Sequence, residues 1–300
     1  MILTEKGKTG KTAYRSSPIK RKRRSKQDIE SLCRDILEIV AKQQPMTVRQ
    51  VFYRLVVAGK IKKTEAEYKG TVCRLLAGMR RRGELPYEWI ADNTRWMRKP
   101  DTYSGLDEML RLSQQTYRRA LWNDQDAYVE VWLEKEALAG VLVGTTAEYD
   151  VPLMVTRGYP SISFLHSAGE AISAIEKPVF LYYFGDRDPS GVDIDRFVES
   201  EIRKHAPGCD LTFQRVAVLE EQIEEYGLPT RPTKKSDSRA KNFNGESVEV
   251  DAIEPDMLRE LGHECITKHI DQDQLDRTRV AEKVERGTLA MYVKDLEGQQ

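Results

Sequence analysis

The sequence predicts an α/β protein in which a mainly helical, basic N-terminal domain precedes a domain built on a parallel β-sheet. The first observation is the distribution of charge: residues 1–100 hold 25 Lys and Arg against 10 Asp and Glu. The second is the pattern beyond residue 126, where short apolar runs alternate with amphipathic segments. Such an alternation is typical of parallel strands joined by helices that cover both faces of the sheet.

Composition narrows the class of protein. The chain has 300 residues and a net charge of zero, yet the residues after Pro100 hold 23 Lys and Arg against 38 Asp and Glu. A basic first third favours a polyanionic partner, and double-stranded DNA is the expected one. No apolar run reaches the ~18 residues of a membrane span, and the four cysteines, which lack CxxC spacing, are typical of reduced thiols. We therefore expect a cytoplasmic, nucleoid-associated protein with no membrane segment.

The first 26 residues predict a disordered basic arm. They hold ten basic residues against one acidic residue and have little apolar content. The stretch GKTGKT at 7–12 is not a phosphate-binding loop, because that motif needs a Gly at the position of Glu5.

Residues 27–100 predict three helices and a short strand pair. Apolar positions at helical spacing place the helices at 28–43, 48–59 and 64–82. The stretch ELPYEWIADNTR that follows is typical of a short strand pair, or wing. Three helices followed by a wing resemble a winged-helix DNA-binding domain, although a plain three-helix cap is the alternative. The predicted DNA contacts in this domain are the basic residues that end the third helix: Arg80, Arg81 and Arg82.

Residues 101–125 predict a helical connector, and residues 126–300 predict the parallel-sheet α/β domain with a C-terminal extension. The four apolar runs expected to form its strands are residues 127–134, 151–158, 178–186 and 210–218. A polar, basic loop follows at 228–247, and two of its residues, Lys234 and Arg239, are further candidates for DNA contact. The rest of the chain is expected to be helical after one short strand.

Carboxylates stand where two of the expected strands end. Asp186 and Asp188 follow one apolar run and lie two residues apart, so they share one side of an extended segment. Glu134 ends the first strand of this domain. Ligands of parallel sheets bind at the carboxyl ends of the strands. Three carboxylates gathered there would repel one another, and they would suit a hard divalent cation, most plausibly Mg2+.

Four stretches resemble a known family. LEKEAL at 133–138 and GDRDPSGVDI at 185–194 are similar to the Toprim fold of topoisomerases, bacterial primases and some nucleases. TRGYPS at 156–161 and TVRQVFYRL at 47–55 are similar to the topoisomerase VI A subunit and to the meiotic double-strand-break transesterases. The resemblance runs over residues 30–220 in the order winged helix, then Toprim domain.

The resemblance implies a function. It makes Tyr53 the nucleophile, Arg49 its phosphate-contacting partner, Glu134 an acid and metal ligand, and Asp186 and Asp188 the other metal ligands. The implied activity is Mg2+-dependent DNA cleavage by tyrosine transesterification, in the manner of a type IIB topoisomerase A subunit. The implied assembly is a homodimer in which tyrosine and metal come from different subunits. The sequence contains no ATPase domain, so ATP-driven strand passage would need a separate B-type subunit.

Two other readings stay open. The chain could be a Toprim nuclease that hydrolyses DNA and uses Tyr53 only for packing, since an aromatic side chain on an amphipathic helix is often a core residue. It could also be a DNA-binding partner subunit that does not cleave. Phe52 stands where a second tyrosine is common in the family, which leaves Tyr53 as the one candidate nucleophile in that motif. Glu130 could line the site, whereas His263, Cys265 and His269 match no familiar zinc spacing.

Overall fold

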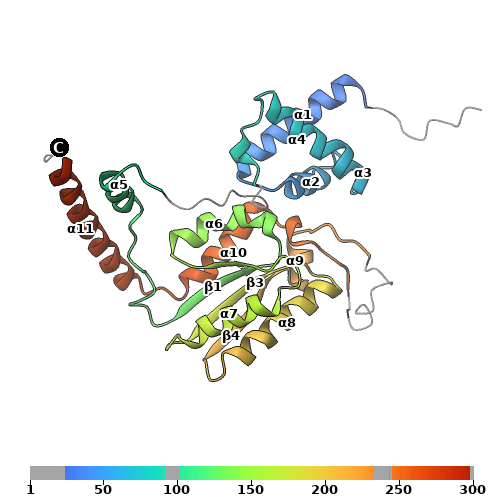
Figure 1. Cartoon of the computed structure of the whole chain (residues 1–300). Helices are drawn as coiled ribbons and strands as arrows, with labels where there is room; N and C mark the ends of the chain where they lie inside the picture. Colours follow the sequence, from blue (N-terminus) through green and yellow to red (C-terminus); the bar gives the residue numbers. More distant parts are fainter. Residues whose placement is uncertain (1–23, 92–101, 233–242, 244, 298–300) are drawn as a thin grey trace, which may run out of the picture.

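The computed structural model describes residues 24–91, 102–232, 243 and 245–297 (Figure 1). Nearly all of the predicted basic arm at 1–26 lies outside the described residues. The same holds for Lys234 and Arg239 of the predicted DNA-contacting loop.

Four parallel strands form the sheet, in the order β2-β1-β3-β4. The strands are β1 Tyr128–Leu133, β2 Leu153–Val155, β3 Val179–Phe184 and β4 Leu211–Ala217. The predicted α/β class with a parallel sheet is therefore confirmed. β2 is shorter than predicted at both ends, and after it Arg157 and Gly158 take positive φ angles of 56° and 82°, which extended strands do not adopt.

Helices cover both faces of the sheet (Figure 1). The helices on one face are α6 Ala139–Glu148 and α10 Pro255–Thr267, and those on the other are α7 Ile162–Ser173 and α8 Pro189–His205. Side chains alternate accordingly: Val131 and Leu133 of β1 belong to the core with α6 and α10, while Trp132 belongs to the core with α7 and α8. Shorter elements are the 3-10 turn η3 Glu136–Leu138, α9 Glu220–Glu225 and the 3-10 turn η5 Val250–Ala252.

The predicted connector at 101–125 contains α5 Leu106–Thr116, which packs along the long C-terminal helix α11 Gln272–Glu297. The hydroxyl of Tyr117 donates to Oε2 of Glu285 at 2.7 Å and helps to hold the two helices together. The connector is therefore half of a helical pair that projects to one side of the sheet (Figure 1).

The N-terminal helices begin at side-chain caps. Ser25 caps α1 Lys26–Gln43 and Thr47 caps α2 Val48–Val57, each in a reciprocal capping box. The predicted helix at 64–82 forms as three consecutive pieces, namely α3 Glu65–Glu67, the π-helical turn η1 Tyr68–Cys73 and α4 Arg74–Arg81.

The predicted strand pair after the third helix differs from the structure in its described part. Residues 84–91 contain the 3-10 turn η2 Tyr87–Trp89 and one isolated bridge, between Met46 and Ile90. Pro86, which lacks a backbone N–H, leads into the turn. The carbonyl of Trp89 then accepts from the N–H of Met46, and the N–H of Ala91 donates to the carbonyl of Met46. The second half of the predicted wing lies outside the described residues.

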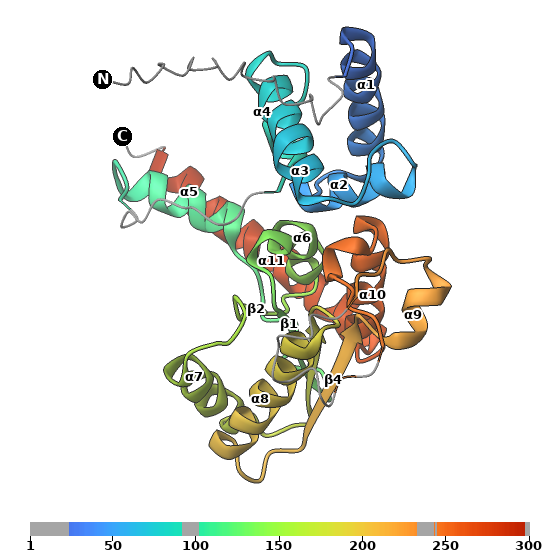
Figure 2. The same cartoon turned by 90° about the vertical axis from the view of Figure 1, so that its right-hand side faces the viewer.

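The N-terminal helices sit beside the sheet with α2 on the side that faces it (Figure 2). Helices α1 and α4 extend away from the sheet (Figure 1). The consequence for function is that Arg49 and Tyr53, both on α2, lie on the sheet-facing side, whereas α4, which ends in the predicted DNA contacts, does not.

Candidate functional site

The ends of β1 and β3 bring two predicted carboxylates together. Leu133 and Phe184, the last residues of these neighbouring strands, are register partners, so Glu134 and Asp186 follow side by side. The backbone N–H of Asp186 donates to Oε2 of Glu134 at 2.9 Å. Gly185 makes room for this contact, because a Cβ there would lie 2.7 Å from Oε2 of Glu134 and 2.5 Å from the Tyr183 ring.

The surroundings of both carboxylates disfavour their ionised forms. Burial and the neighbouring Asp186 raise the pKa of Glu134 to about 7. Burial also raises the pKa of Asp186, although Lys135 acts in the opposite direction. A buried pair of carboxylates that suppresses its own ionisation fits a divalent cation, which would supply the missing positive charge.

Asp188 turns away from that pair. Its Oδ1 accepts from the backbone N–H groups of Ser190 and Gly191, so it caps the N-terminus of α8, and its Oδ2 accepts from Arg231 at 3.1 Å. Among the described residues, no three His, Cys, Asp or Glu side chains are gathered in a way that would hold a metal ion. Glu134 and Asp186 are therefore the candidate first ligands, while Asp188 is engaged by the N-terminus of α8 and by Arg231.

Lys135 is the cation nearest to this pair, and sequence reasoning gave it no role. Its Nζ contacts Asp186 at 2.8 Å, Asp251 at 2.7 Å and Glu249 at 3.4 Å. Burial alone would lower the pKa of Lys135, but the surrounding carboxylates, Asp251 foremost, raise it above its usual value. Lys135 therefore stays charged and neutralises part of the acidic cluster.

The sequence analysis did not predict Glu249 and Asp251 as site residues, because they lie about sixty residues beyond Asp186 in the chain. Glu249 contacts Arg49 at 3.6 Å, Lys135 at 3.4 Å and Arg231 at 3.0 Å. Burial opposes its charge, but these cations lower its pKa overall. The one available signal was the two-residue spacing of Glu249 and Asp251, which repeats that of Asp186 and Asp188.

Arg49 and Tyr53 on α2 differ in their access to the site. Arg49 lies with its Cζ 4.3 Å from the centroid of the Tyr68 ring and reaches Glu249. Tyr53 is only 2% exposed. Burial, and after it the charge of Glu249, raises the pKa of Tyr53 well above its usual range. In this arrangement the tyrosine is a protonated core side chain.

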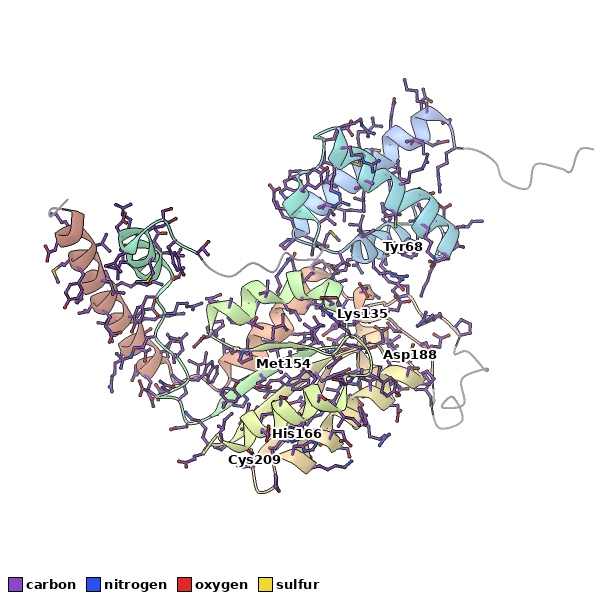
Figure 3. The ribbon with its side chains drawn as sticks, viewed as in Figure 1. Tyr68, Lys135, Met154, His166, Asp188 and Cys209 are labelled. Carbon is purple, nitrogen blue, oxygen red and sulfur yellow. The ribbon has the colours of Figure 1, made fainter. Side chains whose placement is uncertain are left out.

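A cleft of about 490 Å³ separates α2 and η1 from the strand ends. The charged and aromatic residues on its wall are Arg49, Tyr68, Glu134, Lys135, Glu136, Arg157 and Asp251. Figure 3 shows Tyr68 on the underside of the N-terminal helices, facing the side of the sheet domain that carries Lys135. Tyr68 and Arg157 were not foreseen as site residues, while Tyr53 does not line the cleft.

The predicted DNA contacts on α4 lie apart from this cleft. Arg81 is exposed, Arg82 pairs with Glu84 at 2.7 Å, and Arg80 packs its guanidinium over the Tyr87 ring. None of these three residues lines the cleft. DNA bound at the end of α4 would therefore be a separate contact from DNA bound at the carboxylates.

Several other titratable residues have structural partners. Glu130 is buried and accepts from Trp132 Nε1 and the Tyr128 hydroxyl, so it does not line the cleft. The hydroxyls of Tyr149 and Tyr182 pair with His263 and His269 respectively, which explains these two histidines without a metal.

Comparison with known proteins does not assign the chain to a family. No protein-family model matches the sequence, and no curated protein matches it either. Within the described residues, none of the helices has the length and apolar character needed to cross a membrane.

Proposed function

We propose that the chain cleaves double-stranded DNA by Mg2+-dependent tyrosine transesterification, as a type IIB topoisomerase A subunit does. In this proposal residues 27–100 are a winged-helix domain and residues 126–300 a Toprim domain with its C-terminal extension. The observation that carries the proposal is the cleft in which Arg49, from the N-terminal helices, faces Glu134 from the end of β1.

The chemistry assigns one role to each residue. The phenolic oxygen of Tyr53 attacks the phosphorus, a tyrosine–phosphate ester forms, and the bond to one deoxyribose oxygen breaks. Arg49 binds the phosphate, since a guanidinium is suited to phosphate oxygens. The phenol proton leaves to water and the departing deoxyribose oxygen takes a proton from water, because Glu134 gives up its own proton when it binds the cation. A bound Mg2+ would neutralise the charge that grows on the phosphate oxygens, and Glu134 and Asp186, joined by Asp188, would hold it.

Because one ester replaces another, the broken strand remains resealable. The proposed assembly is a homodimer that cuts both strands, with a separate B-type ATPase subunit for strand passage.

A second candidate is hydrolysis of DNA at the same carboxylates. The observation in its favour is that Tyr53 is buried and absent from the cleft wall. In this alternative, water attacks the phosphorus and Tyr53 serves only in packing.

End-labelled duplex DNA, incubated with the protein and Mg2+ and analysed on a denaturing gel, separates the two candidates. Transesterification leaves DNA covalently attached to protein, and Tyr53→Phe abolishes the adduct while DNA binding persists. Tyr292→Phe, which alters an exposed tyrosine of α11, is the matched control. Free ends with 5′ phosphates, produced equally by wild type and Tyr53→Phe, would establish hydrolysis instead.

A further inference from the structure

Helix α2 is enclosed on more than one side. Five of its ten residues are buried, and they occupy adjacent positions rather than one helical stripe: Gln50, Val51, Phe52, Tyr53 and Leu55. A helix packed only within a small helical domain would expose the opposite face. On α2 that face is covered by η5 and its neighbours, which pack directly against it.

The covering segment comprises residues 249–259, which we call the latch strip. Its residues Val250, Ala252 and Ile253 are buried in the same hydrophobic core as the apolar side chains of α2. Polar contacts add to this packing. Glu254 pairs with Arg54, whose guanidinium also donates to the carbonyl of Ala252 at 2.6 Å. Asp251 accepts from the Thr47 hydroxyl at 3.2 Å, and Glu249 contacts Arg49 at 3.6 Å.

The latch strip also holds the turn that precedes α2. Gln43 donates to Oε2 of Glu254 at 3.0 Å, and Arg259 donates to the carbonyl oxygens of Gln43 and Pro45 at 3.3 and 2.7 Å. The contact is therefore anchored at the turn before α2 and at Arg54 near the end of the helix.

Tyr53 lies within this enclosed helix. Two carboxylates of the latch strip, Glu249 and Asp251, are among the charges that raise the pKa of its hydroxyl. Its nucleophilic role needs the opposite surroundings, namely access to the cleft and to a phosphate. The two requirements conflict in the observed arrangement.

The ion pair between α2 and the latch strip is one that can break reversibly. The Glu254 side chain is 44% exposed and that of Arg54 is 11% exposed, so water reaches this ion pair from the side of Glu254 and weakens it. Release would transfer those groups to water without leaving a fully buried charge at Arg54 or Glu254. A contact of this kind is suited to a reversible two-state element.

We propose that the latch strip is an intrachain latch that holds the N-terminal helices in a closed state with Tyr53 sequestered, and that DNA cleavage requires its release. The closed state is a property of the chain alone. The link to cleavage rests on the proposed function of Tyr53.

Nitration of tyrosines by tetranitromethane, located by peptide mass spectrometry, tests the closed state without DNA or metal. In the wild type Tyr53 should react far more slowly than Tyr87 and Tyr292, which are 62% and 61% exposed and serve as internal references. Arg54→Glu and Glu254→Arg should each accelerate nitration of Tyr53 about tenfold, because each removes an ion pair and adds a like-charge repulsion.

The double variant Arg54→Glu/Glu254→Arg restores opposite charges and should slow nitration of Tyr53 again. Glu30→Arg is the matched control: Glu30 pairs with Lys26 at the start of α1, outside the pocket that Arg54 and Glu254 share, so nitration of Tyr53 should stay slow. Far-UV circular dichroism and urea unfolding identify variants that are merely unfolded.

Native-state hydrogen exchange of the wild type tests the same point without any substitution. The amides of α2 should exchange through an opening at urea concentrations below those that expose the sheet. Equal nitration of Tyr53 in folded single variants and wild type would overturn the latch, as would exchange of α2 only on global unfolding.

The cleavage assay separates this inference from the proposed function. With DNA and Mg2+, the folded single variants should form several-fold more covalent adduct than the wild type. An unchanged adduct yield despite faster nitration would overturn the regulatory role. Absence of adduct in every protein would overturn transesterification, while the nitration and exchange results would still decide whether the latch exists.

Discussion

The backbone N–H of Asp186 donates a hydrogen bond to the carboxylate of Glu134 at 2.9 Å, across the ends of strands β1 and β3. The two residues are 52 positions apart in the chain, and the strand register alone makes them neighbours. The hydrogen bond favours the charged form of Glu134, but burial and the nearby Asp186 outweigh it. Near pH 7 the pair can therefore hold either a proton, on Glu134, or a cation, and the first two predictions follow from this.

Stability of the metal-free protein should fall as the pH rises from about 4.3 to about 7 through the contribution of Glu134. The pKa of Glu134 is raised to about 7 in the folded protein, so the folded state binds a proton that the unfolded state releases. The stabilisation is complete below the unfolded pKa and is lost above pH 7, and it amounts to at most about 4 kcal/mol. Urea unfolding in chelator at pH 5, 6, 7 and 8 measures it. Glu134→Gln should flatten the slope, whereas Glu176→Gln, before β3, should not; an unchanged slope in Glu134→Gln would contradict the assignment.

Divalent cations should bind more tightly as the pH rises through 7, since the cation replaces the proton on Glu134. Titration calorimetry with Mn2+ measures this affinity apart from any catalysis. Asp186→Asn should weaken binding at least about tenfold, because it removes one charged oxygen ligand. It should also reduce Mg2+-dependent cleavage at least about 100-fold. Wild-type affinity in both Asp186→Asn and Glu134→Gln would show that the cation binds elsewhere.

Lys135→Met should destabilise the protein at pH 8 by about 3 kcal/mol or more, because it leaves Asp186, Glu249 and Asp251 without their shared cation. Urea unfolding measures the loss. Added Mg2+ should recover part of it by replacing the positive charge. Lys42→Met, which breaks the exposed pair with Glu38, should cost at most about 0.5 kcal/mol. Equal effects of the two substitutions would mean that the acidic cluster does not depend on Lys135.

Gly191→Ala should disrupt the carboxylate loop. A Cβ at this position would lie 2.1 Å from the carbonyl oxygen of Asp186, so either α8 or the loop must move. We expect destabilisation of about 3 kcal/mol or more and weaker Mn2+ binding. Gly144→Ala is the matched control, since a Cβ there meets nothing within 4 Å in the middle of α6, and it should stabilise by about 0.5–1 kcal/mol. A folded Gly191→Ala variant with wild-type stability would refute this account of the loop.

The local pattern of the sequence determined the α/β class and the position of the carboxylates along the chain. Continuous apolar runs such as VFLYYF predict strands buried on both faces, and the structure confirms four parallel strands. Glu134 and Asp186 could be placed at strand ends for the same reason. The polarity of residues 101–125 and the helical period of residues 28–43 were likewise local properties, and α5 and α1 formed where they predicted helices.

Only the tertiary structure decided which side chains share the site. Strand register joined Glu134 to Asp186, and the return of the chain after β4 brought Glu249 and Asp251 to Lys135. Asp188 follows the same strand as Asp186, but its carboxylate accepts hydrogen bonds from the first backbone N–H groups of α8 instead of joining Glu134 and Asp186. The enclosure of α2 depends on its packing against the latch strip, about 200 residues away in the chain. No local pattern of residues encodes a contact between such distant segments.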